Sequence, residues 1–380
     1  MRPFRPIHFM RPGFLPTLVA LGAILLLPPD RAAQETVPAA SGPVSAATPG
    51  ITVVAGEIEG ALFTLARPAQ WNRKVLLLAH GLIDEGSKKI AALDIRDTAY
   101  ARLLDEGWLI ASTSYRRNGV IVRDAIADVN ALRDHIERTE GRPQTVLLYG
   151  VSMGGAVVTL IAENEPGRYQ GVVAVGVATQ ARDPQYPLAF TSEPKIPILF
   201  LANQSELERP TTYIGRVPPT AVQPALWTVA RDGHANVNSA EVAAALDGLI
   251  GWVETGSVTL RRDATVLVAT PPGDTTIEGD TAHGRVDSIT ANNGNLFTTF
   301  RPGDFEKLGI AKGDTFELTA GGKTYTVRYG TTYGDVPRGE WVAFLRAEGL
   351  ILLARNYGNA AETTGIQPGD VLAVRALKKP

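Results

Sequence analysis

A glycine-flanked serine at residues 150–154 constrains the fold more than any other feature of this chain. The run reads Gly-Val-Ser-Met-Gly, and it joins the apolar stretch Thr145–Tyr149 to a helical stretch of small residues. A strand that turns this sharply into a helix strains its central residue, and close backbone approach requires glycines beside it. The pattern predicts that Ser152 projects its hydroxyl above a sheet, although a serine that only caps the helix is the alternative. Three glycines are expected to support the turn: Gly150, Gly154 and Gly155.

Further apolar runs alternate with amphipathic helical patterns along the chain. Lys74–Ala79 and Ile196–Ala202 are almost continuously apolar, as strands of a parallel sheet are when both faces are covered. Val122–Ile136 places apolar residues three and four apart, which is typical of a helix packed by one face. The alternation predicts an α/β fold, a mostly parallel sheet with helices on both faces. Further strands are expected at Trp108–Thr113, Gly171–Ala178 and Ala225–Val229.

A nucleophilic serine needs a general base, and the chain has only five histidines. His234 lies in a loop between the strand-type run Ala225–Val229 and a helix whose start is marked by Asn238 and Glu241, a capping box. It is therefore the candidate base, and a loop histidine without a role is the alternative. The remaining histidines lie in the leader, after the Lys74 strand, on a helix and near the C-terminal region: His8, His80, His135 and His283.

A carboxylate is needed to orient the histidine, and it is expected in the loop after Ile196–Ala202. Glu206 is the first candidate and Glu208 the second, while both could also be solvated loop charges. An oxyanion needs two backbone N–H donors, one after the nucleophile and one after the early strand. Met153 and Leu82 are the candidates for those amides.

Residues 51–254 resemble the α/β-hydrolase superfamily. The resemblance implies a serine hydrolase whose serine, acid and histidine come in that order, as Ser152, Glu206 and His234 do. Between Ala178 and Pro197 there is room for a loop but not for a helical lid, so an open pocket is expected unless another domain covers it. The matching runs are His80-Gly81, Gly150–Gly155 and Gly233-His234.

The N-terminal residues predict export. Residues 1–33 combine arginines, an apolar run and a small-residue cleavage region, which is typical of a secretory signal peptide. A secreted or periplasmic protein without a stable membrane anchor after cleavage is therefore expected, and an uncleaved anchor is the alternative. Residues 34–50 read as a flexible linker, residues 51–255 as the catalytic domain and residues 259–380 as a second, all-β domain.

The amino-acid composition limits the kinds of ligand and partner that can be expected. The chain has no cysteine, so neither a disulfide framework nor a thiolate metal site can form, and no metal or cofactor is expected. A net charge of −2 with interspersed signs gives no reason to expect nucleic acid as a partner. A small-molecule ester or amide is the expected substrate.

Short β-type runs dominate after residue 259. Thr315–Thr319 and Thr324–Tyr329 flank a glycine-containing turn, which predicts a hairpin. Gly309–Asp314 recurs as Gly365–Asp370, each before a β-run, which predicts two similar turns. A barrel-like domain is expected.

Several glycine-containing runs stand out in residues 270–377: Gly284–Val286, Gly294–Leu296, Tyr333–Glu340, Asn356–Ala361, Gly365 and Gly369-Asp370. With these runs, the region is similar to the C-terminal domain of the S-adenosyl-L-methionine hydroxide adenosyltransferases, relatives of the chlorinases and fluorinases. The family's other half is missing, and Ile289–Asn293 replaces its usual Ile-Asp-x-Phe run. The resemblance implies nucleoside binding near Asn356, Asn359 and Ala361, and oligomerisation through this domain.

Taken together, these features predict an exported serine hydrolase that forms an acyl-enzyme, with ester hydrolysis favoured over peptide hydrolysis. The alternatives are a nucleoside- or ligand-binding protein that uses the β-domain, a serine peptidase, and an S-adenosylmethionine hydrolase. The β-domain could also serve only for packing or for covering the hydrolase pocket.

Overall fold

The computed structural model describes residues 50–179, 189–271 and 273–377, and its first domain is built on one nine-stranded sheet. The strand order is β1-β2-β4-β3-β5-β6-β7-β8-β9. The first two strands are antiparallel to their neighbours and the others run parallel, so the predicted α/β fold is confirmed. The strands are β1 (Ile51–Ile58), β2 (Ala61–Pro68), β3 (Lys74–Ala79), β4 (Leu109–Thr113), β5 (Thr145–Val151), β6 (Gly171–Val175), β7 (Ile198–Asn203), β8 (Ala225–Val229) and β9 (Arg261–Asp263).

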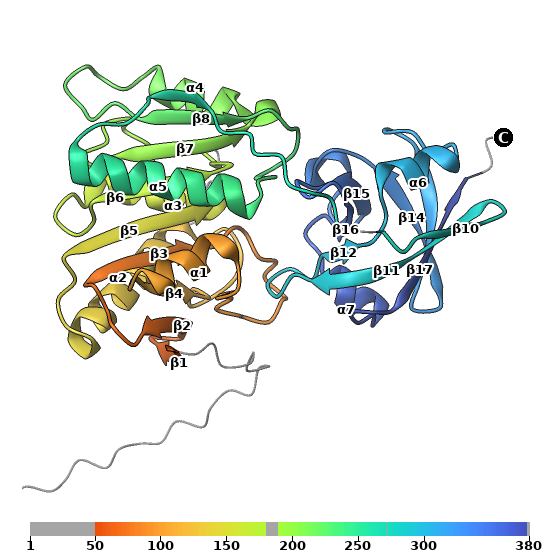
Figure 1. Ribbon diagram of the computed structural model, residues 1–380, viewed down its shortest axis with the longest axis horizontal. Coiled ribbons are helices and arrows are strands. Elements are labelled where there is room, and N and C mark those ends of the chain that lie inside the picture. The colour runs from red at the N-terminus through yellow and green to blue at the C-terminus, as the bar shows by residue number, and fades with distance from the viewer. Residues whose placement is uncertain (1–49, 180–188, 272, 378–380) are drawn as a thin grey trace, which may run out of the picture. The chain divides into compact units, whose positions relative to one another are not determined.

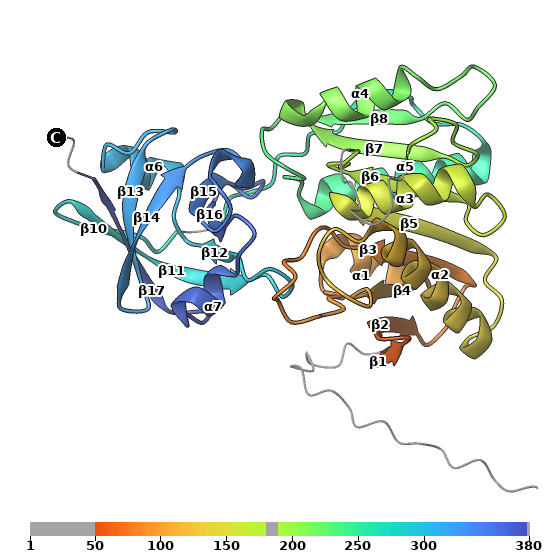
Figure 2. The ribbon, with the colours of Figure 1, turned by 180° about the vertical axis from the view of Figure 1, so that it is seen from behind.

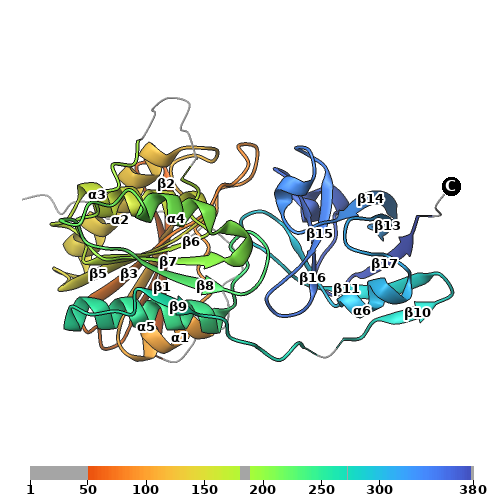
Figure 3. The same cartoon turned by 90° about the horizontal axis from the view of Figure 1, so that it is seen from above.

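Helices cover both faces of this sheet. One apolar cluster joins the sheet to α2, α3 and α4, and a second cluster on the other face joins it to α1 and α5. Figure 1 shows α1 and α5 in front of the strands. In the opposite view of Figure 2, α2 and α3 lie in front of them, and Figure 3 shows the two helix layers edge-on. The helices are α1 (Thr98–Asp105), α2 (Val122–Thr139), α3 (Met153–Asn164), α4 (Glu208–Ile214) and α5 (Ser239–Thr255).

The start of α5 follows the capping box that the sequence predicts. The Asn238 side chain accepts a bond from the Glu241 amide at 3.0 Å, and the Glu241 carboxylate accepts one from the Asn238 amide at 2.9 Å. Both residues are buried, so the cap fixes where the preceding loop ends.

The second domain is a closed barrel of seven strands. Strands β11 and β17 pair at the closure, and β14 and β15 form its parallel pair. Its core is a separate apolar cluster, which agrees with the expectation of a barrel-like domain. The elements are β10 (Thr276–Glu278), which pairs with β11 alone, β11 (Thr281–Ile289), β12 (Leu296–Thr298), α6 (Pro302–Lys307), β13 (Thr315–Ala320), β14 (Lys323–Tyr329), β15 (Trp341–Leu345), β16 (Ile351–Arg355), α7 (Ala360–Thr364) and β17 (Val371–Ala376).

The predicted hairpin and the two similar turns are present in the barrel. Gly321 and Gly322 connect β13 to β14 with φ values of 58° and 73°, a region that glycine reaches without a Cβ clash. In the repeated turns, the carboxylates of Asp314 and Asp370 accept bonds from backbone amides three residues earlier, at 2.9 Å and 2.8 Å. Each turn leads into one of two paired strands, β13 and β17.

The first sheet extends beyond the boundary that the sequence suggests between the domains. Strand β9 pairs with β8 through Leu226 and Arg261, whereas the second domain was expected to begin at residue 259. Composition places the boundary too early because β9 is short and fully exposed, so it carries no apolar pattern. The predicted signal peptide and residues 34–49 of the predicted linker lie outside the described residues. Among the helices of the described part, none is long and apolar enough to cross a membrane.

Candidate active site

Ser152 occupies a strained turn between β5 and α3. Its backbone has φ 56° and ψ −115°, and its amide donates to Val175 O at 2.8 Å. The Ser152 side chain makes no capping bond to α3, so the helix-cap alternative is excluded. A non-glycine residue in this region is held there by its surroundings, which often happens where a side chain must be presented for chemistry.

The predicted supporting glycines lie where a side chain would collide with backbone. A Cβ on Gly150 would lie 2.2 Å from Gly154 O, and one on Gly154 would lie 1.9 Å from Ala79 O. Gly155 is less tight, because its Cβ would lie 3.2 Å from Val177 Cα. The start of α3 therefore passes against β3 and β5 at a distance that only glycine permits.

Replacing Gly154 with alanine is expected to lower the free energy of unfolding by on the order of 3 kcal/mol, because the new Cβ overlaps a backbone carbonyl that cannot rotate away. Urea unfolding of the full chain, followed by circular dichroism, measures the change. Gly251 in α5 is the matched control, since nothing lies within 4 Å of its Cβ position. Gly251→Ala is expected to raise stability by about 0.5–1 kcal/mol. Equal stability of Gly154→Ala and the unsubstituted chain would contradict the close approach.

His234 lies between Ser152 and Glu206. Its Nε2 is 2.7 Å from Ser152 Oγ, and its Nδ1 is hydrogen-bonded to Glu206 Oε1. An ionised carboxylate has no proton to give, so Nδ1 donates to Glu206, and in a neutral imidazole Nε2 then accepts from the Ser152 hydroxyl. The second Glu206 oxygen accepts from the Ala235 amide at 3.0 Å, which fixes the carboxylate against the histidine loop.

The structure brings Glu206, and not Glu208, to the histidine. Glu206 ends a 3₁₀ turn after β7 (Gln204–Glu206), and its side chain is 13% exposed. Glu208 is exposed at the start of α4, and within the described residues it makes no hydrogen bond or ion pair. Of the two candidates that the sequence offers, the geometry therefore favours Glu206, the first choice, as the carboxylate beside His234.

Buried polar contacts hold the histidine loop. Asn203 Nδ2 donates to Asn236 O at 2.9 Å, and the Asn236 amide donates back to Asn203 Oδ1 at 2.7 Å. Arg231 donates to the same Asn236 carbonyl at 2.9 Å and to the fully buried carboxylate of Glu241 at 3.0 Å. These bonds give the buried polar groups partners and hold the loop against β7 and the start of α5.

The candidate oxyanion donors lie on either side of Ser152. Met153 begins α3 and Leu82 follows β3; neither amide donates a hydrogen bond to any group in the described residues. A Cβ on Gly81 would lie 3.2 Å from Ser152 Cβ, so the loop after β3 passes directly beside the serine. Both amides are thus free to bind an incoming oxygen, as an oxyanion hole requires.

His80 and Tyr115 support that loop. The Tyr115 hydroxyl donates to His80 O at 3.0 Å, and the two ring centroids are 4.0 Å apart. Burial lowers the pKa of the His80 imidazole, which favours its neutral form, and Nδ1–H donates to Gly81 O at 2.6 Å. His80 therefore acts in holding the backbone and not as a second base at Ser152.

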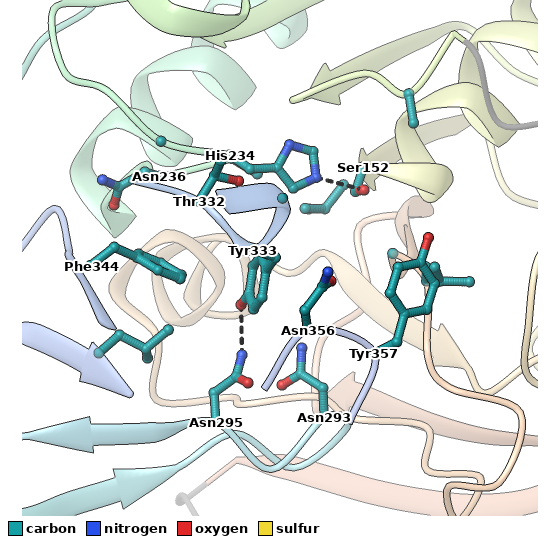
Figure 4. Close-up of a pocket in the computed structure, with 18 of the residues that line it drawn as sticks. Ser152, His234, Asn236, Asn293, Asn295, Thr332, Tyr333, Phe344, Asn356 and Tyr357 are labelled. Atoms are coloured by element: carbon teal, nitrogen blue, oxygen red, sulfur yellow. Dashed lines mark hydrogen bonds between the residues drawn. The ribbon is translucent and has the colours of Figure 1, made fainter. Parts of the chain in front are cut away.

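A cavity of about 820 Å³ opens over Ser152, and residues of both domains line it. The two domains belong to one compact unit, Ala40–Pro380. The barrel therefore forms part of the cavity wall, as the sequence allowed, and leaves the cavity partly open. Figure 4 shows the Ser152–His234 pair facing the barrel side chains. The barrel residues in the lining include Asn293, Asn295, Tyr333, Phe344, Asn356 and Tyr357.

Three contacts tie the barrel to loops of the first domain. Asn236, two residues after the histidine, donates to Leu345 O at 3.0 Å. Asp84, two residues after Leu82, pairs with Arg338 at 2.8 Å, and Asp232 lies 3.6 Å from Lys312. The barrel thus contacts both the histidine loop and the loop of the candidate oxyanion donor.

Of the three residues predicted to bind a nucleoside, the structure brings one to the cavity and not the other two. Asn356 lines the cavity, whereas Asn359 and Ala361 are not among its lining residues. Asn359 caps α7 by accepting from the Glu362 amide at 2.9 Å, and the Ala361 amide donates to Gly294 O at 3.0 Å. Both are engaged in holding the barrel together.

Sequence reasoning missed the barrel residues that share the cavity with Ser152. Asn295 and Tyr333 fall within runs that carry the family resemblance, but no spacing rule connects them to a serine far away in the sequence. The position of Asn236, two residues after the candidate base, could have marked it as a site residue. Its bond to Leu345 is visible only in the structure.

Comparisons with known proteins match the two domains separately. Residues 113–213 match the model of the serine aminopeptidase family S33, and residues 284–373 match that of the S-adenosyl-L-methionine hydroxide adenosyltransferase C-terminal domain. No protein of curated function matches the chain significantly.

Among solved structures, an uncharacterized conserved protein from Thermotoga maritima is 21% identical with a TM-score of 0.26; the match covers 35% of this chain and 49%, about half, of that protein. An esterase from Pyrococcus furiosus is 15% identical with a TM-score of 0.38, covering 47% of this chain and 80% of the esterase. A dienelactone hydrolase from Anabaena variabilis is 15% identical with a TM-score of 0.39, covering 54% and 98%. The chain therefore joins a domain with an α/β-hydrolase-like fold to a barrel similar to the C-terminal domain of the S-adenosyl-L-methionine hydroxide adenosyltransferases.

Proposed function

We propose that the chain is a serine hydrolase that cleaves carboxylic esters through an acyl-enzyme. The observation that carries the proposal is the series of hydrogen bonds from Ser152 Oγ through His234 to Glu206. The strained backbone of Ser152 supports it, because that geometry presents the hydroxyl to the cavity. A nucleophile, a base and an orienting acid are the parts that acyl transfer needs.

Each step then has a residue to perform it. Ser152 Oγ attacks the ester carbonyl while His234 Nε2 takes the hydroxyl proton, and Glu206 stabilises the imidazolium that forms. The amides of Met153 and Leu82 bind the oxyanion. When the tetrahedral intermediate collapses, the bond from the carbonyl carbon to the alcohol oxygen breaks and His234 returns the proton to the alcohol. Water, deprotonated by His234, then bonds to the acyl carbon; the bond from that carbon to Ser152 Oγ breaks, His234 returns the proton to Oγ, and the acid leaves.

Esters are favoured over amides because of the leaving group. An alkoxide is a better leaving group than an amide nitrogen, so an ester is the less demanding substrate for the same residues. A peptidase remains the second candidate because of the match to the serine aminopeptidase model at residues 113–213.

Labelling of the purified protein with a fluorophosphonate is the test. We expect one covalent adduct on Ser152, detected by intact mass and peptide mapping, because among the described residues this is the serine that is hydrogen-bonded to His234. Ser152→Ala is expected to abolish both labelling and the hydrolysis of 4-nitrophenyl acetate.

Ser87→Ala is the matched control for this test. Ser87 also lines the cavity, but its hydroxyl makes no hydrogen bond within the described residues, so its replacement is expected to leave labelling intact. Parallel assays with amino-acid nitroanilides separate an esterase from a peptidase. A folded protein that takes no label, or takes it at Ser87, would overturn the proposal.

A further inference from the structure

We infer that the cavity over Ser152 takes the ester of a neutral, hydroxylated ring, such as an acetylated sugar, and that the barrel wall binds the ring. This inference rests on the proposed serine hydrolase and names its substrate class. The barrel residues that carry it are Asn293, Asn295, Tyr333, Asn356 and Tyr357, all of which line the cavity.

The charged side chains that line the cavity have no excess of either sign, and some of them form ion pairs. Arg346 pairs with Glu348 at 3.1 Å, and Arg355 donates to Gly339 O at 2.7 Å and 3.0 Å. Asp84 pairs with Arg338 at 2.8 Å. Arg355 keeps its charge because its partner is a neutral carbonyl, but the lining as a whole is balanced, with three carboxylates (Asp84, Glu206, Glu208) and three arginines (Arg209, Arg346, Arg355). A carboxylate or an ammonium group would thus gain no excess of opposite charge, which favours a neutral ligand.

Several neutral polar groups of the barrel wall still have hydrogen-bonding capacity. The Tyr333 hydroxyl accepts from Asn295 Nδ2 at 2.6 Å, which leaves its own proton free to donate. Asn356 donates from Nδ2 to Val336 O at 2.8 Å, and its Oδ1 accepts from no group in the described residues. Asn293 Oδ1 accepts from Thr290, which leaves the Nδ2 protons free. The wall therefore offers donors and acceptors next to one another.

One further acceptor lies buried beside the cavity. Asn292 Oδ1 is buried beside the cavity and makes no hydrogen bond within the described residues. An unpaired buried oxygen is unfavourable unless a ligand or water donates to it. A hydroxyl group both donates and accepts, so several hydroxyls on one ring match this mixture of unpaired groups.

Aromatic rings complete the wall. The Tyr357 ring is 47% exposed and stacks against Arg338, whose guanidinium carbon lies 4.8 Å from the ring centroid. Tyr333 packs against Phe344 with ring centroids 5.1 Å apart. In Figure 4 the side chains of Asn293, Tyr333 and Asn356 converge below the Ser152–His234 pair, with the Tyr357 ring beside them. A ring ligand can lay its C–H face on an aromatic side chain while its edge meets the asparagines.

A long acyl chain fits this lining poorly. Pockets for apolar ligands are lined mostly by hydrophobic side chains with a few polar groups, whereas seven of the fifteen barrel residues in this lining are asparagines or threonines. The hydroxylated part of the substrate is therefore assigned to the barrel, and a short acyl group to the space beside Ser152.

The test compares two acetate esters whose rings have the same size. We expect kcat/KM for the monoacetate of methyl glucoside to exceed that for cyclohexyl acetate by about ten-fold or more, because only the sugar satisfies the polar wall. Tyr333→Phe keeps the ring that packs on Phe344 and removes the hydroxyl, so it is expected to reduce this ratio about five- to ten-fold. Tyr357→Ala should also reduce it.

Tyr325→Phe is the control, because Tyr325 is a barrel tyrosine that packs on Trp341 and does not line the cavity. It is expected to leave both kcat/KM values unchanged. An equal preference for the two esters, a preference for 4-nitrophenyl palmitate, or a ratio that Tyr333→Phe does not change would overturn the inference while leaving the hydrolase intact.

Binding separates failure of the inference from failure of the proposed function. Saturation-transfer NMR of methyl glucoside monoacetate with Ser152→Ala protein needs no turnover, and we expect a signal that weakens in Ser152→Ala/Tyr333→Phe. Binding without hydrolysis by the unsubstituted protein would sink the esterase but support the subsite. Hydrolysis of simple acetates without this binding would do the reverse.

Discussion

Replacing His234 with alanine is expected to lower kcat for 4-nitrophenyl acetate by about four to six orders of magnitude, comparable with the loss expected for Ser152→Ala. The reason is that Ser152 Oγ has His234 Nε2 as its proton acceptor at 2.7 Å, and without it the hydroxyl stays protonated and weakly nucleophilic. The variant should fold, since His234 lies in a partly exposed loop. Steady-state kinetics with active-site titration measures the loss.

The double variant Ser152→Ala/His234→Ala provides the sharper test. Residues that act as one unit lose their effect together, so the double variant is expected to be no slower than either single variant. His283→Gln is the control, because this histidine lies on β11 outside the cavity lining and should leave kcat unchanged. If the losses in kcat of the two single variants multiplied in the double variant, or if His234→Ala kept near-normal activity, another group would take the proton.

The first domain was predictable because burial on both faces leaves a strong sequence pattern. Strands β3 to β8 are nearly continuous apolar runs, and α2 and α5 have a clear apolar face or a clear cap. The hairpin of β1 and β2 and the short strand β9 were not predicted. Strands β1 and β9 are largely exposed, so periodicity cannot separate them from loops. Strand β2 is mostly buried and its burial alternates, so its sequence did carry a strand pattern that was overlooked.

The candidate site was predictable only where local chemistry decides it. Ser152 is marked by its glycines, which the backbone around it requires, and His234 by its place between a strand and a capped helix. The barrel side of the cavity was not predictable. Tyr333 and Asn356 share the cavity with Ser152 through the packing of two domains, and no local pattern records contacts over such a sequence separation.

The choice between two neighbouring glutamates shows the same limit on a smaller scale. Glu206 and Glu208 are separated by one residue, so the sequence presents both to the histidine loop. The 3₁₀ turn after β7 directs Glu206 inward, and the start of α4 leaves Glu208 exposed. The local backbone conformation decides which of the two side chains contacts His234. Two identical side chains give no information about that conformation.

Replacing Glu206 with glutamine is expected to lower kcat by about 10⁴-fold while the fold is retained. Glu206 accepts two bonds, from His234 Nδ1 and from the Ala235 amide at 3.0 Å. A glutamine has only one acceptor oxygen, and an amide nitrogen facing Nδ1 would donate to it and move the ring proton to Nε2. His234 would then have no lone pair to take the Ser152 proton. Kinetics with 4-nitrophenyl acetate and thermal unfolding together measure the two effects.

Glu208→Gln is the matched control, because it makes the same chemical change two residues away on an exposed side chain. It is expected to leave kcat within about two-fold, because Glu208 lines the cavity but within the described residues bonds to neither Ser152 nor His234. A large loss in Glu208→Gln with little change in Glu206→Gln would assign the acid to Glu208 and require the loop after β7 to rearrange before catalysis. A loss in both variants would indicate that the loop acts through its total charge and not through one oriented carboxylate.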